Sequence, residues 1–189
     1  MKKKTITEML GTRYPIIMAP MFLVTNTKMM IEALNSGIAA CIPALNFRTD
    51  RELREGIQNI RKKTKSNGLG VNLIVNKSNV KMMQQLKTCI DLKVDFIITS
   101  LGNPKKVIDL CKPIGIKIFC DVIEENYAKK VQNLGADALV AVNKNAGGHA
   151  GNFDSKELIK RIQKHCSIPI IAAGGVGVKS EVKEKIKEG

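Results

Sequence analysis

Short runs of Val, Ile, Leu and Ala alternate with charged, amphipathic segments along the whole chain. Seven such runs are nearly continuously hydrophobic, at residues 14–20, 38–43, 69–75, 94–100, 116–122, 136–142 and 168–175. A strand that is covered on both faces has this pattern, whereas a strand with one face in water alternates apolar and polar residues. The runs therefore predict interior strands of an α/β protein.

Helices are predicted between and after these strands, at 27–37, 48–65, 79–93, 103–115, 124–135, 155–167 and 179–189. Several segments place apolar residues on one helical face, as Tyr127, Val131 and Leu134 do. Glycine follows three helices where a left-handed C-terminal cap favours it, at Gly37, Gly115 and Gly135. Candidate N-caps begin three others, at Asn79, Asn103 and Ser155.

Strict alternation of strand and helix predicts parallel strands joined by helical crossovers. An open doubly wound sheet and a (β/α)₈ TIM barrel both satisfy this order. Polar residues and glycines recur at the carboxyl ends of the predicted strands, as at Asn72, Ser100 and His149. In a barrel all these ends meet at one mouth, whereas an open sheet uses only its switch point. The pattern favours the barrel, as one domain over residues 1–189.

A complete barrel has eight strand–helix units and about 250 residues. This sequence has 189 residues and ends in a seventh helical segment, with no eighth strand behind it. We therefore expect an incomplete barrel of about seven units, without the eighth unit or a C-terminal helical region. An open sheet would expose its edges, which predicts association into a homo-oligomer.

The formal net charge of +14 is the strongest compositional bias. Lysines occur on every predicted helix, which favours a solvated surface that also steers anionic substrates. Aromatic residues make up only 4% of the chain, and no recognition motif accompanies the charge. A nucleic-acid partner is therefore not expected.

The sequence also indicates the cellular compartment in which the protein is expected. No apolar run approaches the about 18 residues of a membrane span, and no apolar segment follows the basic N-terminus as in a signal peptide. The five cysteines form no CxxC pair, so we expect reduced thiols and no metal site. These features predict a cytoplasmic protein without a membrane partner.

Two glycine-containing segments follow the last two predicted strands. Gly174 and Gly175 would let backbone amides approach a phosphate, which barrels often bind after the seventh strand, or would simply make a tight turn. Gly147 and Gly148 would let the backbone lie against a flat ligand. His149 behind them could act as a general base or bind a substrate anion, or it could cap the following helix.

The segments PIIMAPM, GVN, SLGNP, GADALVAVNKNAGGHAG and IPIIAAGGV resemble, in order and spacing, the nitronate monooxygenase (2-nitropropane dioxygenase) family. That family includes the flavin-dependent enoyl-ACP reductases. The resemblance covers essentially the whole chain and implies an FMN-dependent (β/α)₈ barrel.

The resemblance also implies roles for individual residues. Cofactor binding would fall to residues at four strand ends: Ala19, Pro20, Met21, Asn72, Gly147, Gly148, Gly174 and Gly175. His149 would be the catalytic histidine, and Ser100, Gly102 and Pro104 would belong to a loop near the substrate. Three departures stand out: Val142 replaces a Gln or Glu, Asn145 replaces an acidic residue, and the Gly-Thr segment after an eighth strand is absent.

Two activities are consistent with this resemblance. One is a nitronate monooxygenase, in which FMN accepts an electron from an anionic alkyl nitronate and O₂ then reacts. The other is an enoyl-ACP reductase, with NAD(P)H as electron donor and acyl carrier protein as partner. The first strand end, Ala19–Met21, resembles the former branch, and Gly102–Pro104 the latter. A non-catalytic truncated barrel and a flavin-free phosphate-sugar enzyme are further alternatives.

Overall fold

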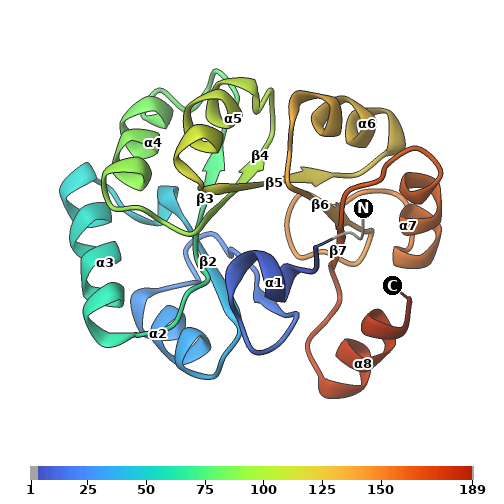
Figure 1. The fold of residues 1–189 in the computed structure, drawn as a ribbon, viewed down its shortest axis with the longest axis horizontal. Helices are drawn as coiled ribbons and strands as arrows, with labels where there is room; N and C mark the ends of the chain where they lie inside the picture. Colours follow the sequence, from blue (N-terminus) through green and yellow to red (C-terminus); the bar gives the residue numbers. More distant parts are fainter. Residues whose placement is uncertain (1–3, 189) are drawn as a thin grey trace. The chain divides into compact units, whose positions relative to one another are not determined.

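The computed structural model describes residues 4–188 of the chain, which forms two compact units. The N-terminal unit ends at Ile118 and the C-terminal unit begins at Phe119, so the boundary falls inside the fifth strand. Figure 1 labels most of the helices and strands of both units.

The N-terminal unit contains four strands and the helices that connect them. Its elements are α1 (Ile6–Leu10), β1 (Ile17–Met18), α2 (Thr27–Asn35), β2 (Ala39–Pro43), η1 (Ala44–Asn46), α3 (Asp50–Lys63), β3 (Leu69–Ile74), α4 (Met82–Asp91), β4 (Phe96–Ser100), α5 (Lys105–Cys111) and η2 (Lys112–Ile114). The boundary divides β5 (Lys117–Val122), and the C-terminal unit continues from Phe119 with α6 (Glu125–Leu134), β6 (Ala138–Val142), α7 (Ser155–Gln163), β7 (Ile170–Ala173) and α8 (Lys179–Glu188).

Strands that follow one another in the chain are also neighbours in space, and they run parallel. In the N-terminal unit β1 pairs with β2, β2 with β3, and β3 with β4. In the C-terminal unit β5 pairs with β6, and β6 with β7. A doubly wound sheet would reverse its strand order at a switch point. Sequential order without reversal is that of a (β/α)₈ barrel, here with seven strands in the described residues, which confirms the predicted fold class.

All seven predicted strands form, and each is shorter than the apolar run that predicted it. The largest difference is the first run, 14–20, of which only Ile17 and Met18 pair with β2. Pro20 has no backbone N–H to continue a ladder, so the strand ends before it. The predicted helix at 103–115 ends at Cys111, because Pro113, which has no backbone N–H for a helical bond, lies in the separate turn η2.

The helices bury one apolar face against the strands. In α3, Leu53, Ile57 and Ile60 recur at helical spacing and are almost completely buried. Figure 1 shows α2, α3 and α4 on the same side of β2 and β3. Gly70 of β3 pairs with Phe96 of β4, and a Cβ at residue 70 would lie 2.2 Å from the Phe96 ring. Glycine there makes room for the aromatic side chain.

The predicted C-terminal caps are confirmed. Gly37, Gly115 and Gly135 have φ angles of 90°, 85° and 103°, the left-handed conformation that glycine adopts most easily. The predicted N-cap at Ser155 is wrong, because Asp154 occupies that position and accepts from the Glu157 N–H at 2.9 Å. Ser155 is instead the first helical residue, and its hydroxyl is buried without a partner among the described residues.

Asn79 and Asn103 are not N-caps either. The caps of α4 and α5 are Lys81 and Pro104, neither of which makes a side-chain capping bond. Each asparagine instead accepts a hydrogen bond from the backbone N–H two residues later, at 3.2 Å and 3.0 Å. These bonds form a local turn at the start of each helix, to the amide of the N-cap Lys81 in α4 and of the first helical residue Lys105 in α5.

All five cysteines are buried, and none forms a disulfide within the described residues. Burial raises the pKa of the Cys111 thiol to about 11, so this group stays protonated at neutral pH. No helix within residues 4–188 combines the length and the apolar character that a membrane crossing requires.

Candidate active site

The predicted site residues divide between the two units. Those of the first, third and fourth strand ends lie in the N-terminal unit, and those after β6 and β7 lie in the C-terminal unit. Within each unit the strands are parallel, so the residues follow strands that end on the same side.

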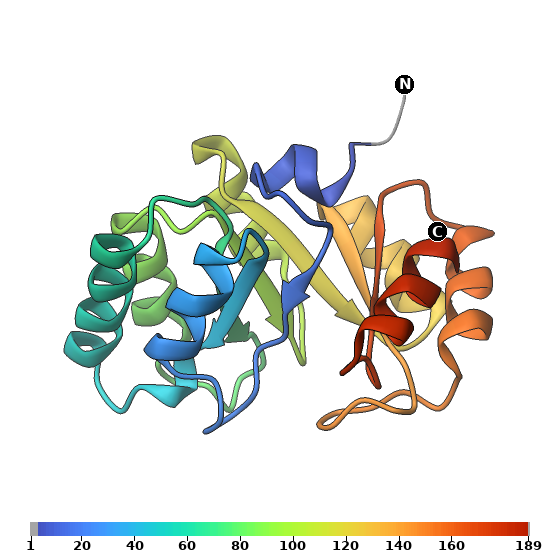
Figure 2. The same ribbon diagram turned by 90° about the horizontal axis from the view of Figure 1, so that it is seen from below.

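Ala19, Pro20 and Met21 begin the loop between β1 and α2. Figure 2 shows this loop running beyond the arrowhead of β1 before it turns back to α2. The buried Thr25 closes it, because its Oγ1 accepts from the Met21 N–H at 2.9 Å and donates to the Ala19 carbonyl at 3.4 Å. Met21 and Pro20 are half-buried, whereas Ala19 is exposed.

Asn46, the last residue of η1, hydrogen-bonds three backbone groups of the same loop. Its Nδ2 donates to the carbonyls of Met21 and Thr25, at 3.2 Å and 2.8 Å. Its Oδ1 accepts from the Leu23 N–H at 2.9 Å. Sequence reasoning did not single out Asn46, since its partners lie more than twenty residues earlier in the chain.

The tip of this loop presents three apolar side chains to solvent. Phe22, Leu23 and Val24 are 62%, 74% and 56% exposed. Leu23 also has φ 59°, a left-handed conformation that costs a branched L-residue about 1–2 kcal/mol. Backbone strain of this kind is concentrated at functional sites, and here it is maintained by the bond to Asn46.

Asn72 and Ser100 are brought together, as adjacent strand ends predict. Asn72 Nδ2 donates to Ser100 Oγ at 2.7 Å and to the Ile98 carbonyl at 3.1 Å. Both of its amide protons are therefore used. Asn72 Oδ1 accepts no hydrogen bond from residues 4–188, so it can accept one from a ligand.

Gly102 lies close to the neighbouring loop in the N-terminal unit. Its φ is 145°, and a Cβ there would lie 2.9 Å from backbone atoms of Val75 and Asn76. The preceding Leu101 has φ 56° and is exposed. The loop after β4 thus has two residues with positive φ in succession, of which only one is glycine.

Gly147, Gly148 and His149 lie in the loop between β6 and α7, which Figure 2 shows extending past the arrowhead of β6. All three are exposed, and a Cβ at either glycine would have no neighbour within 4 Å. The His149 side chain hydrogen-bonds none of the described residues. The buried Gly151 anchors the end of the loop, because a Cβ there would lie 2.7 Å from the Val142 carbonyl oxygen.

Gly174 and Gly175 form the turn after β7, with φ angles of 108° and 68°. A Cβ on Gly174 would lie 2.6 Å from Asn143 Oδ1, and one on Gly175 would lie 2.8 Å from Asn145 Cβ. Glycine is therefore required here by contact with the β6–α7 loop. The structure brings the two glycine segments together, and the contact residue Asn143 was missed from the sequence.

The backbone amides after this turn have two different environments. Gly175 and Val176 donate to no partner among the described residues, and both are exposed. Gly177 and Val178 instead donate to Glu181 Oε2, at 2.7 Å and 3.0 Å. These two bonds hold the pKa of Glu181 below its ordinary value. An anion after β7 would therefore find two open amides beside a carboxylate.

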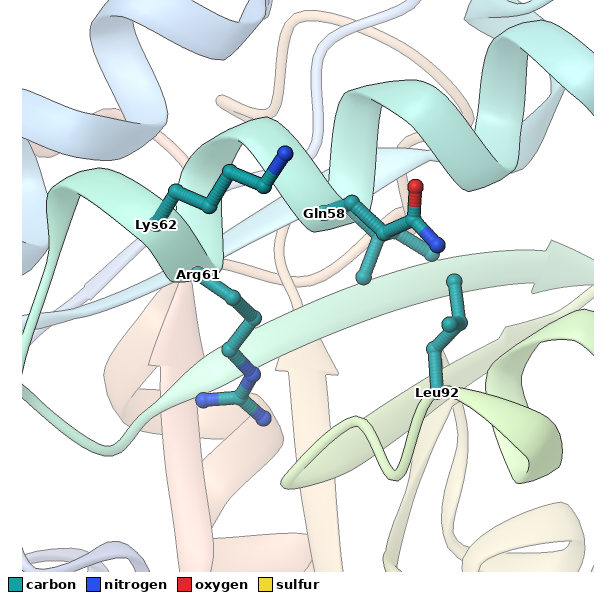
Figure 3. Close-up of a pocket in the computed structure, with 5 residues that line it drawn as sticks. Gln58, Arg61, Lys62 and Leu92 are labelled. Carbon is teal, nitrogen blue, oxygen red and sulfur yellow. The ribbon is translucent and has the colours of Figure 1, made fainter.

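A surface hollow of about 390 Å³ lies elsewhere, on the N-terminal unit. Figure 3 shows Gln58, Arg61 and Lys62 of α3 and Leu92 after α4 around it. These residues precede the amino ends of β3 and β4, opposite to the carboxyl ends that carry the predicted site. Arg61 is already bound to Asp95, so the hollow adds no free cation at that position.

A family model and individual relatives of the chain point to the same family. The nitronate monooxygenase family model matches residues 3–189. A probable nitronate monooxygenase of Staphylococcus aureus (strain JH9) is 30% identical, over 92% of this chain and 61% of that protein. The chain thus spans about 61% of the length of this curated relative.

Solved structures are similar over nearly the whole chain. FabK from Thermotoga maritima has a TM-score of 0.90 and 28% identity, covering 100% of this chain and 60% of FabK. Nitroalkane oxidase from Streptomyces ansochromogenes has a TM-score of 0.86 and 18% identity, covering 98% of this chain and 65% of that chain, which shows a common fold alone. The family model accounts for nearly every residue, and the chain belongs to the nitronate monooxygenase family.

Proposed function

We propose that this chain is an FMN-dependent oxidoreductase that oxidises alkyl nitronates with O₂, with His149 as catalytic base or anion-binding group. The observation that carries the proposal is the open loop after β6. In a chain of this family, Gly147, Gly148 and His149 are exposed at a strand end, with no side chain packed over the glycines.

Three local features fit FMN. The uncovered glycines 147 and 148 leave room for a flat ring system against the backbone. Asn72 offers a free acceptor oxygen for a ring N–H. Gly175 and Val176 offer two amide donors for a phosphate. Glu181 opposes the fit, because its carboxylate takes the next two amides and carries the same sign of charge as a phosphate.

Each of the candidate residues would have its own role in binding the cofactor or the nitronate. FMN, when bound, would supply the redox chemistry for a reaction of the nitronate with O₂. His149 would hold the nitronate anion as a hydrogen-bond donor. As a base, its imidazole nitrogen would instead accept the carbon-bound proton that a neutral nitroalkane loses when it becomes a nitronate. Ala19, Pro20 and Met21 would line the ring, and Ser100 and Gly102 would lie near the substrate. The net charge of +14 would draw an anionic small molecule toward the protein.

The first experiment is a visible absorption spectrum of the purified chain before and after addition of FMN. We expect a flavin spectrum that stays with the protein through gel filtration, and O₂ consumption that depends on an alkyl nitronate. A colourless chain that ignores added FMN would contradict the proposal and would favour the non-catalytic alternative.

The two histidines of the chain make a matched pair for the role of His149. His149→Ala should lower nitronate oxidation by about 10²–10⁴-fold, the range for loss of a positioned acid or base. His165→Ala should leave it unchanged, since His165 is exposed just after α7. Equal effects of the two substitutions would remove His149 from the mechanism.

The second candidate is an FMN- and NAD(P)H-dependent enoyl-ACP reductase, with acyl carrier protein as the partner. The Gly102–Pro104 segment favours it, because that segment resembles the reductase branch of the family. NADH or NADPH oxidation that requires an enoyl thioester, without nitronate-dependent O₂ uptake, would select this activity.

A further inference from the structure

Asn143 directly follows β6, and only 1% of its surface is exposed. Burial of an amide side chain is costly unless each polar atom is hydrogen-bonded. This position is therefore informative, because a buried asparagine between a strand and an exposed glycine loop has to find its partners in the nearby loops.

Asn143 finds these partners in both glycine segments. Its Nδ2 donates to the Gly174 carbonyl at 2.9 Å, and its backbone N–H donates to the Ala173 carbonyl at 2.9 Å. Its Oδ1 accepts from the Asn145 N–H at 2.7 Å, and its carbonyl accepts from the Ala146 N–H at 3.2 Å. One residue thus ties the β7 turn to the start of the loop that carries His149.

The atoms around these bonds leave no space for a side chain at residue 174. A Cβ on Gly174 would lie 2.6 Å from Asn143 Oδ1 and 2.9 Å from the Ala146 nitrogen. With φ at 108°, Gly174 adopts a conformation that other residues rarely take. A side chain at residue 174 would therefore displace the Asn143 amide or the start of the β6–α7 loop.

The bond to the Gly174 carbonyl also sets the direction of a donor. The carbonyl of residue 174 and the N–H of residue 175 belong to one planar trans peptide, so they point in opposite directions. Because Asn143 binds the carbonyl, the peptide cannot rotate freely. The Gly175 N–H, which is exposed and has no partner among the described residues, is thereby held facing away from Asn143.

We propose that Asn143 is the positioning residue of a phosphate site after β7, orienting the Gly175 amide toward the phosphate of FMN. This inference rests on the proposed function and adds to it a residue that touches neither the cofactor nor the substrate. It also predicts that the phosphate end of the ligand, and not its ring system, depends on Asn143.

The test compares FMN with riboflavin, which has the same ring system without the phosphate. Their dissociation constants are measured by quenching of flavin fluorescence for the wild-type chain, Asn143→Ala and Asn143→Ser. We expect Asn143→Ala to weaken FMN binding by about tenfold, the equivalent of one lost hydrogen bond. Riboflavin binding should change by less than about twofold, because one phosphate donor contributes nothing to it.

Thr64→Val is the matched control, because Thr64 is also buried and its hydroxyl donates to the Ile60 carbonyl at 3.0 Å in the N-terminal unit. It should keep the wild-type ratio of FMN to riboflavin affinity. Asn143→Ser, with a smaller packing change, gives the same measurement if the alanine variant does not fold.

The outcomes separate the two proposals. A wild-type chain that binds neither flavin defeats the proposed function and this inference with it. A wild-type chain that prefers FMN, with the same preference in both Asn143 variants, overturns the inference alone. Equal weakening of FMN and riboflavin also overturns it, because Asn143 would then support only the general structure of the unit.

Discussion

Replacing Asp95 by alanine should destabilise the N-terminal unit by about 3 kcal/mol. Asp95 stands just before β4, and its side chain is 23% exposed. Its Oδ2 accepts from the N–H groups of Gly68 and Leu69, at 2.8 Å and 2.7 Å, where β3 begins. The Arg61 guanidinium binds both carboxylate oxygens, at 3.2 Å and 3.1 Å.

The magnitude follows from what would remain after the substitution. Gly68 and Leu69 are buried, so two amides would lose their acceptor at a cost of about 1–3 kcal/mol each. Arg61 is partly exposed and keeps its bond to the Lys93 carbonyl, so loss of the ion pair itself adds only about 0–1 kcal/mol. Asp95→Asn retains one oxygen for both amides and should cost about 1 kcal/mol.

Urea unfolding followed by far-ultraviolet circular dichroism measures these differences. Asp109→Ala is the control. The 2.7 Å ion pair of Asp109 with Lys105 is exposed, at 54% and 59% of the two side chains respectively, and should contribute less than about 0.5 kcal/mol to the free energy of unfolding. An Asp95→Ala variant as stable as Asp109→Ala would refute the reasoning. Such a result would mean that water replaces the carboxylate at the start of β3.

Two further predictions concern single side chains. The hydrogen-bonded Arg161 guanidinium is the main cause, and a backbone hydrogen bond the second, that lower the pKa of Glu125 from 4.5 to about 2. A carboxyl group whose pKa is lower in the folded state stabilises the fold at pH values above its pKa in the unfolded state. The wild type should therefore lose its stability advantage over Glu125→Gln as pH falls from about 4.5 to about 2. A difference in unfolding free energy that stays constant over that range would contradict this. Leu23→Asn should raise stability by about 0.5–1 kcal/mol in urea unfolding, because asparagine tolerates φ 59° and the leucine side chain is 74% exposed. A loss of stability would instead show that Leu23 packs against a partner.

Much of the fold could be read from local patterns. Continuously apolar runs identified every strand, and glycine marked the ends of α6 and η2. These patterns are local because strand and helix periodicity depends on neighbours within a few residues. The family resemblance then placed candidate residues at strand ends, and adjacent strands do bring Asn72 and Ser100 within 2.7 Å.

Exact starting points were harder to predict, because neighbouring residues compete for the same role. Asp154 and Ser155 both suit an N-cap, and the structure selects the aspartate. A carboxylate at the N-terminus of α7 also benefits from the helix dipole, which a serine does not.

Local patterns in the sequence were enough to predict the strand–helix order, the parallel strands and the family of this protein. They did not predict which asparagines organise the loops, and the folded structure was needed to identify them. Asn46 reaches Met21 across 25 residues, and Asn143 reaches Gly174 across 31. Side-chain hydrogen bonds depend on where distant segments meet in space, and local periodicity carries no information about that meeting.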